Sequence, residues 1–246
     1  MAHTLDEDRY GIIEDMKEDG SCVTGKHIVY KAGTHGEVYF DKDAHLSSPD
    51  VPRGIIQLLS EKIPHNAIII APETRSQVNL GVGVAENTGS PLIQTVKIND
   101  KHTLTDGALE ILNKGGVSVL VDDILNNGET LKQVQAALAE MGYTVEEFHV
   151  MVNRNPEYSL WLDLPVYALA TQETRQWDEK EVPPTLKQRA ISTSLGKGRN
   201  WVPKPGQQLS MQFYLERLHK EELGFYFDDG KKVVQMEIDG WELLPR

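Results

Sequence analysis

The stretch of residues 117–130, VSVLVDDILNNGET, decides the fold of this chain. Residues 117–121 are apolar and mostly β-branched, which is typical of a strand that is buried on both faces. Two adjacent carboxylates, Asp122 and Asp123, follow this run. Residues 126–128, Asn-Asn-Gly, then favour a turn. The pattern therefore predicts a buried strand that ends in an acidic pair and a small polar loop.

A helix is expected to begin at Thr130, because apolar residues then recur at helical spacing and Gly142 can cap the last turn. The N-terminus of a helix offers free backbone N–H groups and the positive end of its dipole, and both favour a phosphate. Carboxylates beside such a site suit sugar hydroxyls. A phosphorylated ribose would satisfy both features, but an ordinary turn between a strand and a helix is the alternative.

This stretch resembles the phosphoribosyl-diphosphate (PRPP) motif of type I phosphoribosyltransferases, in which a strand, an acidic pair, a Thr- and Gly-rich phosphate loop and a helix follow one another. The matching positions are Asp122, Asp123, Gly128 and Thr130. Asn126 and Asn127 replace the usual Thr-type residues, so amide donors stand in for hydroxyl donors. The resemblance implies that the acidic pair holds the ribose hydroxyls and that residues 126–130, Glu129 included, hold the 5′-phosphate.

Composition limits the classes of function. The chain has 246 residues, enough for one α/β domain with an appendage, and a formal net charge of −12, which argues against general nucleic-acid binding. Cys22 is the only cysteine, so no disulfide can form within the chain, and a reducing cytoplasm is expected. The polar, acidic beginning is unlike a signal peptide, and no apolar run is long enough to span a membrane.

Apolar runs alternate with helical patterns along residues 4–171, which predicts an α/β fold with a parallel sheet and right-handed crossovers. The expected strands are residues 67–71, 91–96, 117–121, 145–152 and 160–169. The expected helices are residues 4–19, 53–62, 77–89 and 130–142. Residues 97–107 are expected to be a polar loop.

Two further strands, residues 27–31 and 37–41, are expected around the turn-rich residues 32–36. A plain surface hairpin would give this pattern, but the segment also resembles the N-terminal hood of orotate phosphoribosyltransferases. The matching positions are Lys31, Gly33, His35, Tyr39, Phe40 and Asp41. The resemblance implies that Lys31, Tyr39 and Phe40 bind the base, together with Arg154, which follows the fourth strand.

The resemblance also places basic residues near the diphosphate. Arg75 falls in the position of the diphosphate-binding loop, although a solvated arginine would look the same. Lys97, Lys101 and His102 fall in the position of the mobile catalytic loop, where a lysine would neutralise the departing diphosphate, or they belong to an ordinary exposed connection. Mg²⁺ is expected to reach the site on the diphosphate, and no protein metal ligand is assigned.

The composition changes near residue 172. We therefore expect a phosphoribosyltransferase-like domain with its hood over residues 1–171 and an α+β extension over residues 172–246. The extension should contain a polar linker, a helix over residues 211–225 and a hairpin around Asp229 and Gly230.

The sequence thus predicts a transferase that moves a 5-phosphoribosyl group from PRPP to orotate or a related base and releases diphosphate, with Asp122, Asp123 and Lys101 as catalytic residues. A homodimer is implied by the resemblance. One alternative is a degenerate relative that binds PRPP or a nucleotide in a regulatory role. The other is a resemblance of fold alone, with the extension as a protein-interaction module.

Overall fold

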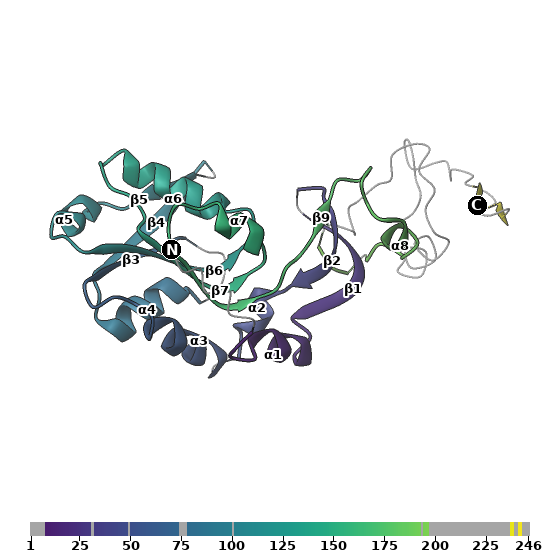
Figure 1. The fold of residues 1–246 in the computed structure, drawn as a ribbon, viewed down its shortest axis with the longest axis horizontal. Coiled ribbons are helices and arrows are strands. Elements are labelled where there is room, and N and C mark those ends of the chain that lie inside the picture. Colours follow the sequence, from purple (N-terminus) through teal and green to yellow (C-terminus); the bar gives the residue numbers. More distant parts are fainter. Residues whose placement is uncertain are drawn as a thin grey trace, which may run out of the picture. The chain divides into compact units, whose positions relative to one another are not determined.

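The computed structural model describes residues 8–30, 32–48, 50–73, 78–99, 101–192, 194–196, 237–238 and 241–242 (Figure 1). The chain divides into two compact units. The core unit comprises Met1–Cys22 and Phe40–Glu173, and the hood unit comprises Val23–Tyr39 and Thr174–Arg246. The division at Glu173 lies beside the domain boundary predicted at residue 172, whereas the hood strands group with the C-terminal segment.

The core unit is built on a six-stranded sheet of order β5-β4-β3-β6-β7-β8. All neighbouring pairs are parallel except β4 and β5, which are antiparallel. The strands are β3 (Ala67–Ala71), β4 (Leu92–Ile98), β5 (Lys101–Leu104), β6 (Val117–Leu125), β7 (Glu147–Asn153) and β8 (Val166–Thr171). This arrangement confirms the predicted α/β fold with a largely parallel sheet and places β6 near the sheet's centre.

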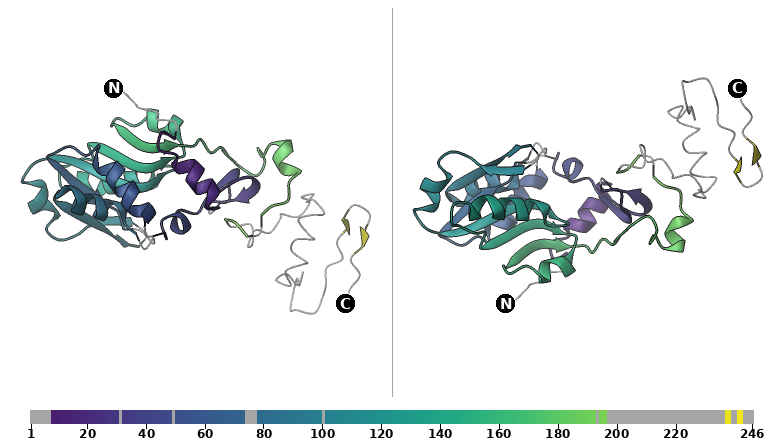
Figure 2. Two further views of the ribbon diagram at one scale, coloured as in Figure 1. Left: turned by 90° about the horizontal axis from the view of Figure 1, so that it is seen from below. Right: turned by 90° about the horizontal axis from the view of Figure 1, so that it is seen from above.

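Helices cover both faces of this sheet (Figures 1 and 2). The helices of the core unit are α1 (Ile12–Glu18), α2 (Lys42–His45), α3 (Asp50–Ser60), α4 (Leu80–Thr88), α5 (Ala108–Leu112), α6 (Glu129–Ala139) and α7 (Pro156–Leu160). The view from below in Figure 2 brings α3 and α4 to the front, and the view from above brings α6 to the front. Successive residues of the parallel strands therefore all meet apolar neighbours, which explains why β3 reads as an unbroken apolar run.

The core beneath α5 and α6 shows how one face of the sheet is buried. Ile68 and Ile70 of β3 and Leu120 of β6 pack there against Val134 and Leu138 of α6, and all five side chains are at most 2% exposed. Burying an aliphatic side chain of this size stabilises the fold by about 1.5–3 kcal/mol. The apolar spacing of the helix after the acidic pair thus fixes α6 on the sheet with its N-terminus beside the end of β6.

Three predictions about the core unit were wrong in their extent. Strand β6 continues to Leu125, because its backbone keeps pairing with β7 as far as Asn153, so the acidic pair lies inside the strand. Residues 97–107 are not simply a loop, since β4 and β5 form a hairpin there. The strand predicted over residues 160–169 begins only at Val166, and the preceding residues form α7, which Asn155 caps by accepting the Tyr158 N–H.

The hood unit contains a three-stranded sheet of order β1-β2-β9, formed by β1 (Cys22–Val29), β2 (His35–Phe40) and β9 (Gln176–Trp177). The two predicted hood strands are therefore present. The segment predicted as a linker also carries α8 (Pro184–Lys187) and is tied to the strands by Arg189, whose guanidinium bonds the Glu37 carboxylate at 3.0 Å. His35 is buried, and its Nδ1 lies 2.8 Å from Nε2 of His27.

The far C-terminal segment is described only at β10 (Glu237–Ile238) and β11 (Trp241–Glu242), which pair in antiparallel fashion. The helix predicted over residues 211–225 and the hairpin predicted around Asp229 and Gly230 lie outside the described residues. Among the helices that the structure describes, none has the length and apolar character needed to cross a membrane.

Candidate active site

The acidic pair lies near the carboxyl end of β6, where parallel α/β sheets commonly bind ligands. Asp122 accepts the backbone N–H of Asp123 at 2.9 Å and a hydrogen bond from the side chain of Thr130, in the first turn of α6. The side chain of Asp122, in the proposed ribose site, is thus joined to the first turn of the helix that would bind the phosphate.

The two carboxylates of the pair stand in different electrostatic surroundings. Burial, and next the charge of Asp123, raise the pKa of Asp122 to about 7. Asp123 is 9% exposed and accepts an ion-paired hydrogen bond from the ammonium group of Lys42. One carboxylate therefore faces a cation, while the other gains a proton readily near neutral pH.

The contact of Lys42 with the acidic pair was not predicted from the sequence. Lys42 is the first residue of α2 and lies 81 residues before Asp123 in the chain. In the sequence it stands between Asp41 and Asp43, and such alternating charges usually mark a solvated surface. No local signal distinguishes a lysine that crosses to a distant strand from one that points into water.

Two of the residues predicted to bind the base are brought together in the core unit. The guanidinium of Arg154 lies over the ring of Phe40, 5.0 Å from the ring centre. The backbone N–H of Arg154 donates to the carbonyl of Leu125 at 2.8 Å, which fixes this arginine at the end of β6. Tyr39 falls in the hood unit, and Lys31 lies outside the described residues.

The proposed phosphate loop turns into α6 at Gly128, which has a φ of +69° and serves as the N-cap. A Cβ atom built on Gly128 would lie 2.4 Å from the Tyr158 ring, so the loop has no room for a side chain there. The amide oxygen of Asn127 accepts the Glu129 N–H at 3.2 Å. The side chain of Asn127, just before the helix, thus holds one of the free N–H donors of the helix's first turn.

Lys132 and Tyr158 were also not predicted. The Lys132 ammonium lies 3.4 Å from the carbonyl oxygen of Asn127 and 5.3 Å from the centre of the Tyr158 ring. Helical side chains lean toward the N-terminus, so a lysine in this turn reaches back toward the loop. Glu129, in contrast, is held on the helix surface by the amide of Gln133 at 2.7 Å.

The β4–β5 hairpin carries the residues predicted to neutralise diphosphate. Lys97 and Lys101 are exposed. His102 is buried, with its Nδ1 2.6 Å from the Thr95 hydroxyl, and its backbone N–H donates to Gln133 of α6 at 3.1 Å. Burial, followed by the charge of Lys97, lowers the pKa of His102. Its ring therefore sits inside the hairpin in the neutral form at pH 7.

The hairpin is also tied to the end of β3. The N–H of Glu73 donates to the Thr95 hydroxyl at 3.1 Å, and the Glu73 carboxylate accepts the N–H of Lys97. The predicted diphosphate loop begins directly after this residue, and Arg75 within it lies outside the described residues. The hairpin and the start of that loop are thus connected through the Thr95 hydroxyl and the Glu73 carboxylate.

The described residues bring together no group of three or more His, Cys, Asp or Glu side chains that could hold a metal ion. The acidic pair offers two carboxylates, and Asp123 already faces the Lys42 ammonium. A magnesium ion carried by a diphosphate fits this donor set better than one held by the protein.

A cavity of about 160 Å³ lies elsewhere in the core unit, lined among others by Leu59, Lys62, His149 and Tyr167. In the sheet, His149 pairs with Val121, the residue before Asp122. The lining of the cavity nevertheless includes neither carboxylate of the acidic pair and no residue of the loop that follows it.

The sequence of this chain is similar to those of known proteins. The orotate phosphoribosyltransferase of Pyrococcus horikoshii is 25% identical over 136 residues, which cover 54% of this chain and 73% of that protein. The enzyme of the same name from Pyrococcus furiosus is 23% identical over 137 residues, 54% of this chain and 75% of that protein. No family model matches the chain.

Comparison with solved structures points to the same class of protein as these sequence relatives. The structure of orotate phosphoribosyltransferase from Aeropyrum pernix matches with a TM-score of 0.50 and 20% identity over 65% of this chain and 93% of that one. The chain has the type I phosphoribosyltransferase fold. The structure of UMP synthase from Leishmania donovani matches with a TM-score of 0.52 and 16% identity over 67% of this chain and 37% of that one. The resemblance predicted from the sequence to orotate phosphoribosyltransferase-like proteins is thus confirmed.

Proposed function

We propose that this protein transfers a 5-phosphoribosyl group from PRPP to a nucleobase, orotate or a related base, and releases diphosphate. The observation that carries the proposal is the acidic pair on β6, which is followed at once by a loop and the N-terminus of α6. In that order, carboxylates that can accept hydrogen bonds from sugar hydroxyls lie beside N–H groups that can donate to a phosphate. We further propose that the protein is cytoplasmic and acts as a homodimer.

Residues of the core unit can be assigned to each part of the proposed reaction. Positive charge grows on the ribose ring as the bond to diphosphate breaks, and carboxylates fixed beside the ring stabilise that charge. Asp122 and Asp123 would bind the ribose hydroxyls, and the backbone of residues 126–130 would bind the 5′-phosphate. Phe40 and Arg154 would contact the base, while Lys97 or Lys101 would neutralise the departing diphosphate.

Magnesium would enter with the substrate and supply charge neutralisation on the diphosphate. The chain's own task is then to hold the sugar between the acidic pair and the phosphate loop. The hydrogen bond that joins Thr130 to Asp122 links these two subsites, so occupation of one is expected to order the other.

A second candidate function is regulatory binding of PRPP or a nucleotide without turnover. Two contacts favour it, because they engage groups that a substrate would need. Lys42 pairs with the Asp123 carboxylate, and the Asn127 side chain accepts the Glu129 N–H. In this case the chain would bind the ligand saturably and release no diphosphate.

A binding experiment tests the site. Isothermal titration with Mg-PRPP should give saturable binding to the parent protein and none to the Asp122→Asn/Asp123→Asn double variant. The exposed Asp163 provides a matched control, and Asp163→Asn should bind like the parent. Equal binding by the parent and the double variant would show that the sugar is not held by this pair.

A further inference from the structure

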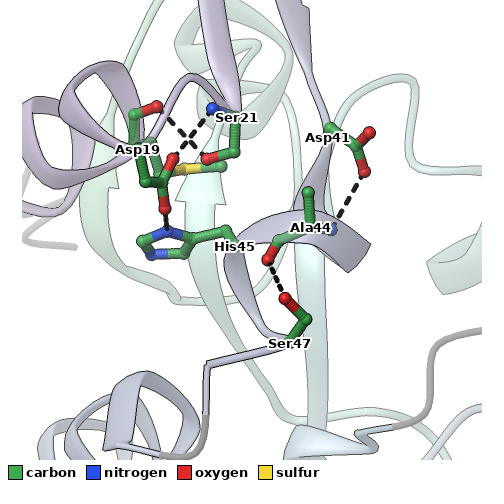
Figure 3. A network of polar contacts seen from close by, with 7 residues as sticks. Asp19, Ser21, Asp41, Ala44, His45 and Ser47 are labelled. Carbon is green, nitrogen blue, oxygen red and sulfur yellow. Dashed lines mark hydrogen bonds and ion pairs between the residues drawn. The ribbon is translucent and has the colours of Figure 1, made fainter.

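Helix α2, which carries Lys42, is fixed by polar contacts at both ends (Figure 3). Asp41 precedes the helix, and its carboxylate accepts the Ala44 N–H at 3.0 Å. At the other end, His45 is 3% exposed and its Nδ1 lies 2.7 Å from the Asp19 carboxylate. A helix of one turn has little stability of its own, so these contacts determine where its side chains point.

The partner of His45 is itself held in place. Asp19 also accepts the Ser21 N–H at 2.8 Å, and the Ser21 hydroxyl donates to the carbonyl of Met16 in α1. Burial alone would raise the pKa of Asp19, but hydrogen bonds from Ser21 and His45 outweigh it and hold that pKa below its ordinary value. An ionised Asp19 thus anchors α2 to the C-terminal end of α1.

From this anchored helix, Lys42 reaches Asp123, and the charged groups that face its ammonium are Asp123, Asp122 and Asp43. Burial would lower the pKa of Lys42, but the charge of Asp123 and the hydrogen bond to it raise that pKa above its ordinary value. The lysine therefore remains charged throughout the range in which the carboxylates titrate.

We propose that Lys42 is the positioning residue of the acidic pair: its ammonium group holds the Asp123 carboxylate in place through an ion-paired hydrogen bond, and its charge sets the pH range in which the pair accepts the hydroxyls of a phosphorylated sugar. This proposal rests on the function proposed above. Adjacent carboxylates repel each other, and a partly buried cation beside them favours the charged form of the pair. The charge of Lys42 accordingly lowers the pKa of Asp122, against burial and the charge of Asp123, which raise it.

The removal of Lys42 has a defined consequence under this proposal. An opposite charge within hydrogen-bond distance typically lowers a carboxyl pKa by about 1–3 pH units. Without the charge of Lys42, the pKa of Asp122 should rise further, and the pair should carry too little charge at pH 7. Sugar binding should then weaken and should recover only when the pH is raised.

The test compares Lys42→Met, Lys42→Arg and the parent protein, with Lys114→Met as a control at an exposed lysine. Binding of Mg-PRPP is titrated between pH 5.5 and 9. We expect Lys42→Met to bind about tenfold more weakly at pH 7, with the midpoint of its pH profile raised by about one pH unit or more. Lys42→Arg should restore the midpoint, and Lys114→Met should leave it unchanged.

A weaker Lys42→Met variant with an unshifted midpoint would overturn the proposal, because the lysine would then act only on packing or on the ligand itself. A second measurement needs no ligand: the carboxyl ¹³C resonance of Asp122 is titrated in the parent and in Lys42→Met. A raised midpoint in the variant supports the proposal, and an unchanged midpoint overturns it. If the parent failed to bind PRPP, the proposed function would fall, while this titration would still decide the role of Lys42.

Discussion

Replacement of Asp122 by Asn should stabilise the folded protein at alkaline pH while it removes a group from the proposed sugar site. The pKa of Asp122 is raised from 3.8 to about 7, so the folded state holds a proton that the unfolded chain has released. A raised pKa contributes stability below the unfolded value, and that stability is lost as the pH rises through about 7. Asn cannot ionise and therefore loses nothing over this range.

The magnitude follows from the two pKa values. A difference of about three pH units corresponds to about 4 kcal/mol, since each unit is worth about 1.36 kcal/mol. The side chain of Asp122 is only partly buried, and the charge of the neighbouring Asp123 affects its titration. We therefore expect about half of this value, about 2 kcal/mol, as the increase in the free energy of unfolding. For a chain of this size that gain raises the melting temperature by about 4–8 °C.

Thermal unfolding followed by circular dichroism at pH 5 and pH 8 measures the effect, with Asp163→Asn as the control. The melting temperature of Asp122→Asn should exceed that of the parent at pH 8, and the difference should be much smaller at pH 5. A variant that melts with the parent at both pH values would show that the carboxylate is not strained by its surroundings, and the electrostatic account of the pair would be wrong.

Further predictions concern the loop, the hairpin and the core. Gly128→Val should weaken PRPP binding far more than Asn126→Thr in calorimetry, because a Cβ at Gly128 would strike the Tyr158 ring, and the reverse ranking would argue against a phosphate loop here. Lys101→Ala should lower the rate of diphosphate release strongly and PRPP affinity only weakly, and an unchanged rate would exclude this lysine. Gly81→Val should destabilise the protein by about 2 kcal/mol or more in urea unfolding, since even a Cβ would lie 3.0 Å from the Ala71 backbone, and an unchanged midpoint would refute this packing.

The parts of the fold that were predictable are those in which apolar residues alone specify the element. β3 was predicted at its observed bounds because every residue of AIIIA is buried. β6 was predicted too short because its apolar run stops at Asp122, whereas backbone pairing with β7 continues regardless of side-chain type. A strand that ends in functional polar residues cannot be delimited by hydrophobicity.

The hairpin was missed for a related reason. Its inward positions include Thr95 and His102, which are buried but polar, so the alternation expected of a half-buried strand was hidden. Asn99, with a φ of 51°, marks the turn, and an Asn followed by Asp is a weaker hairpin signal than Asn-Gly. Because Thr95 and His102 are buried in a hydrogen bond to each other, the sequence lacked the apolar pattern that would have indicated this antiparallel pair.

The acidic pair and the start of the phosphate loop were readable because they are contiguous in the chain. Lys42, Lys132 and Tyr158 were not, since each matters through a contact with another segment. Only folding brings such residues together, and the sequence around a lysine in a charged run does not indicate which residue it will contact. The sequence could therefore indicate the proposed chemistry of the site but not the side chains from other segments that contact it.

The most direct test of the account is a diphosphate-release assay with Mg-PRPP and a panel of nucleobases that includes orotate. The account predicts that at least one base elicits turnover by the parent protein and that the Asp122→Asn/Asp123→Asn variant releases no diphosphate with that base. Saturable PRPP binding without release for any base would select the regulatory function. Neither release nor binding of PRPP would contradict the account, since the acidic pair would then not be a site for a phosphorylated ribose.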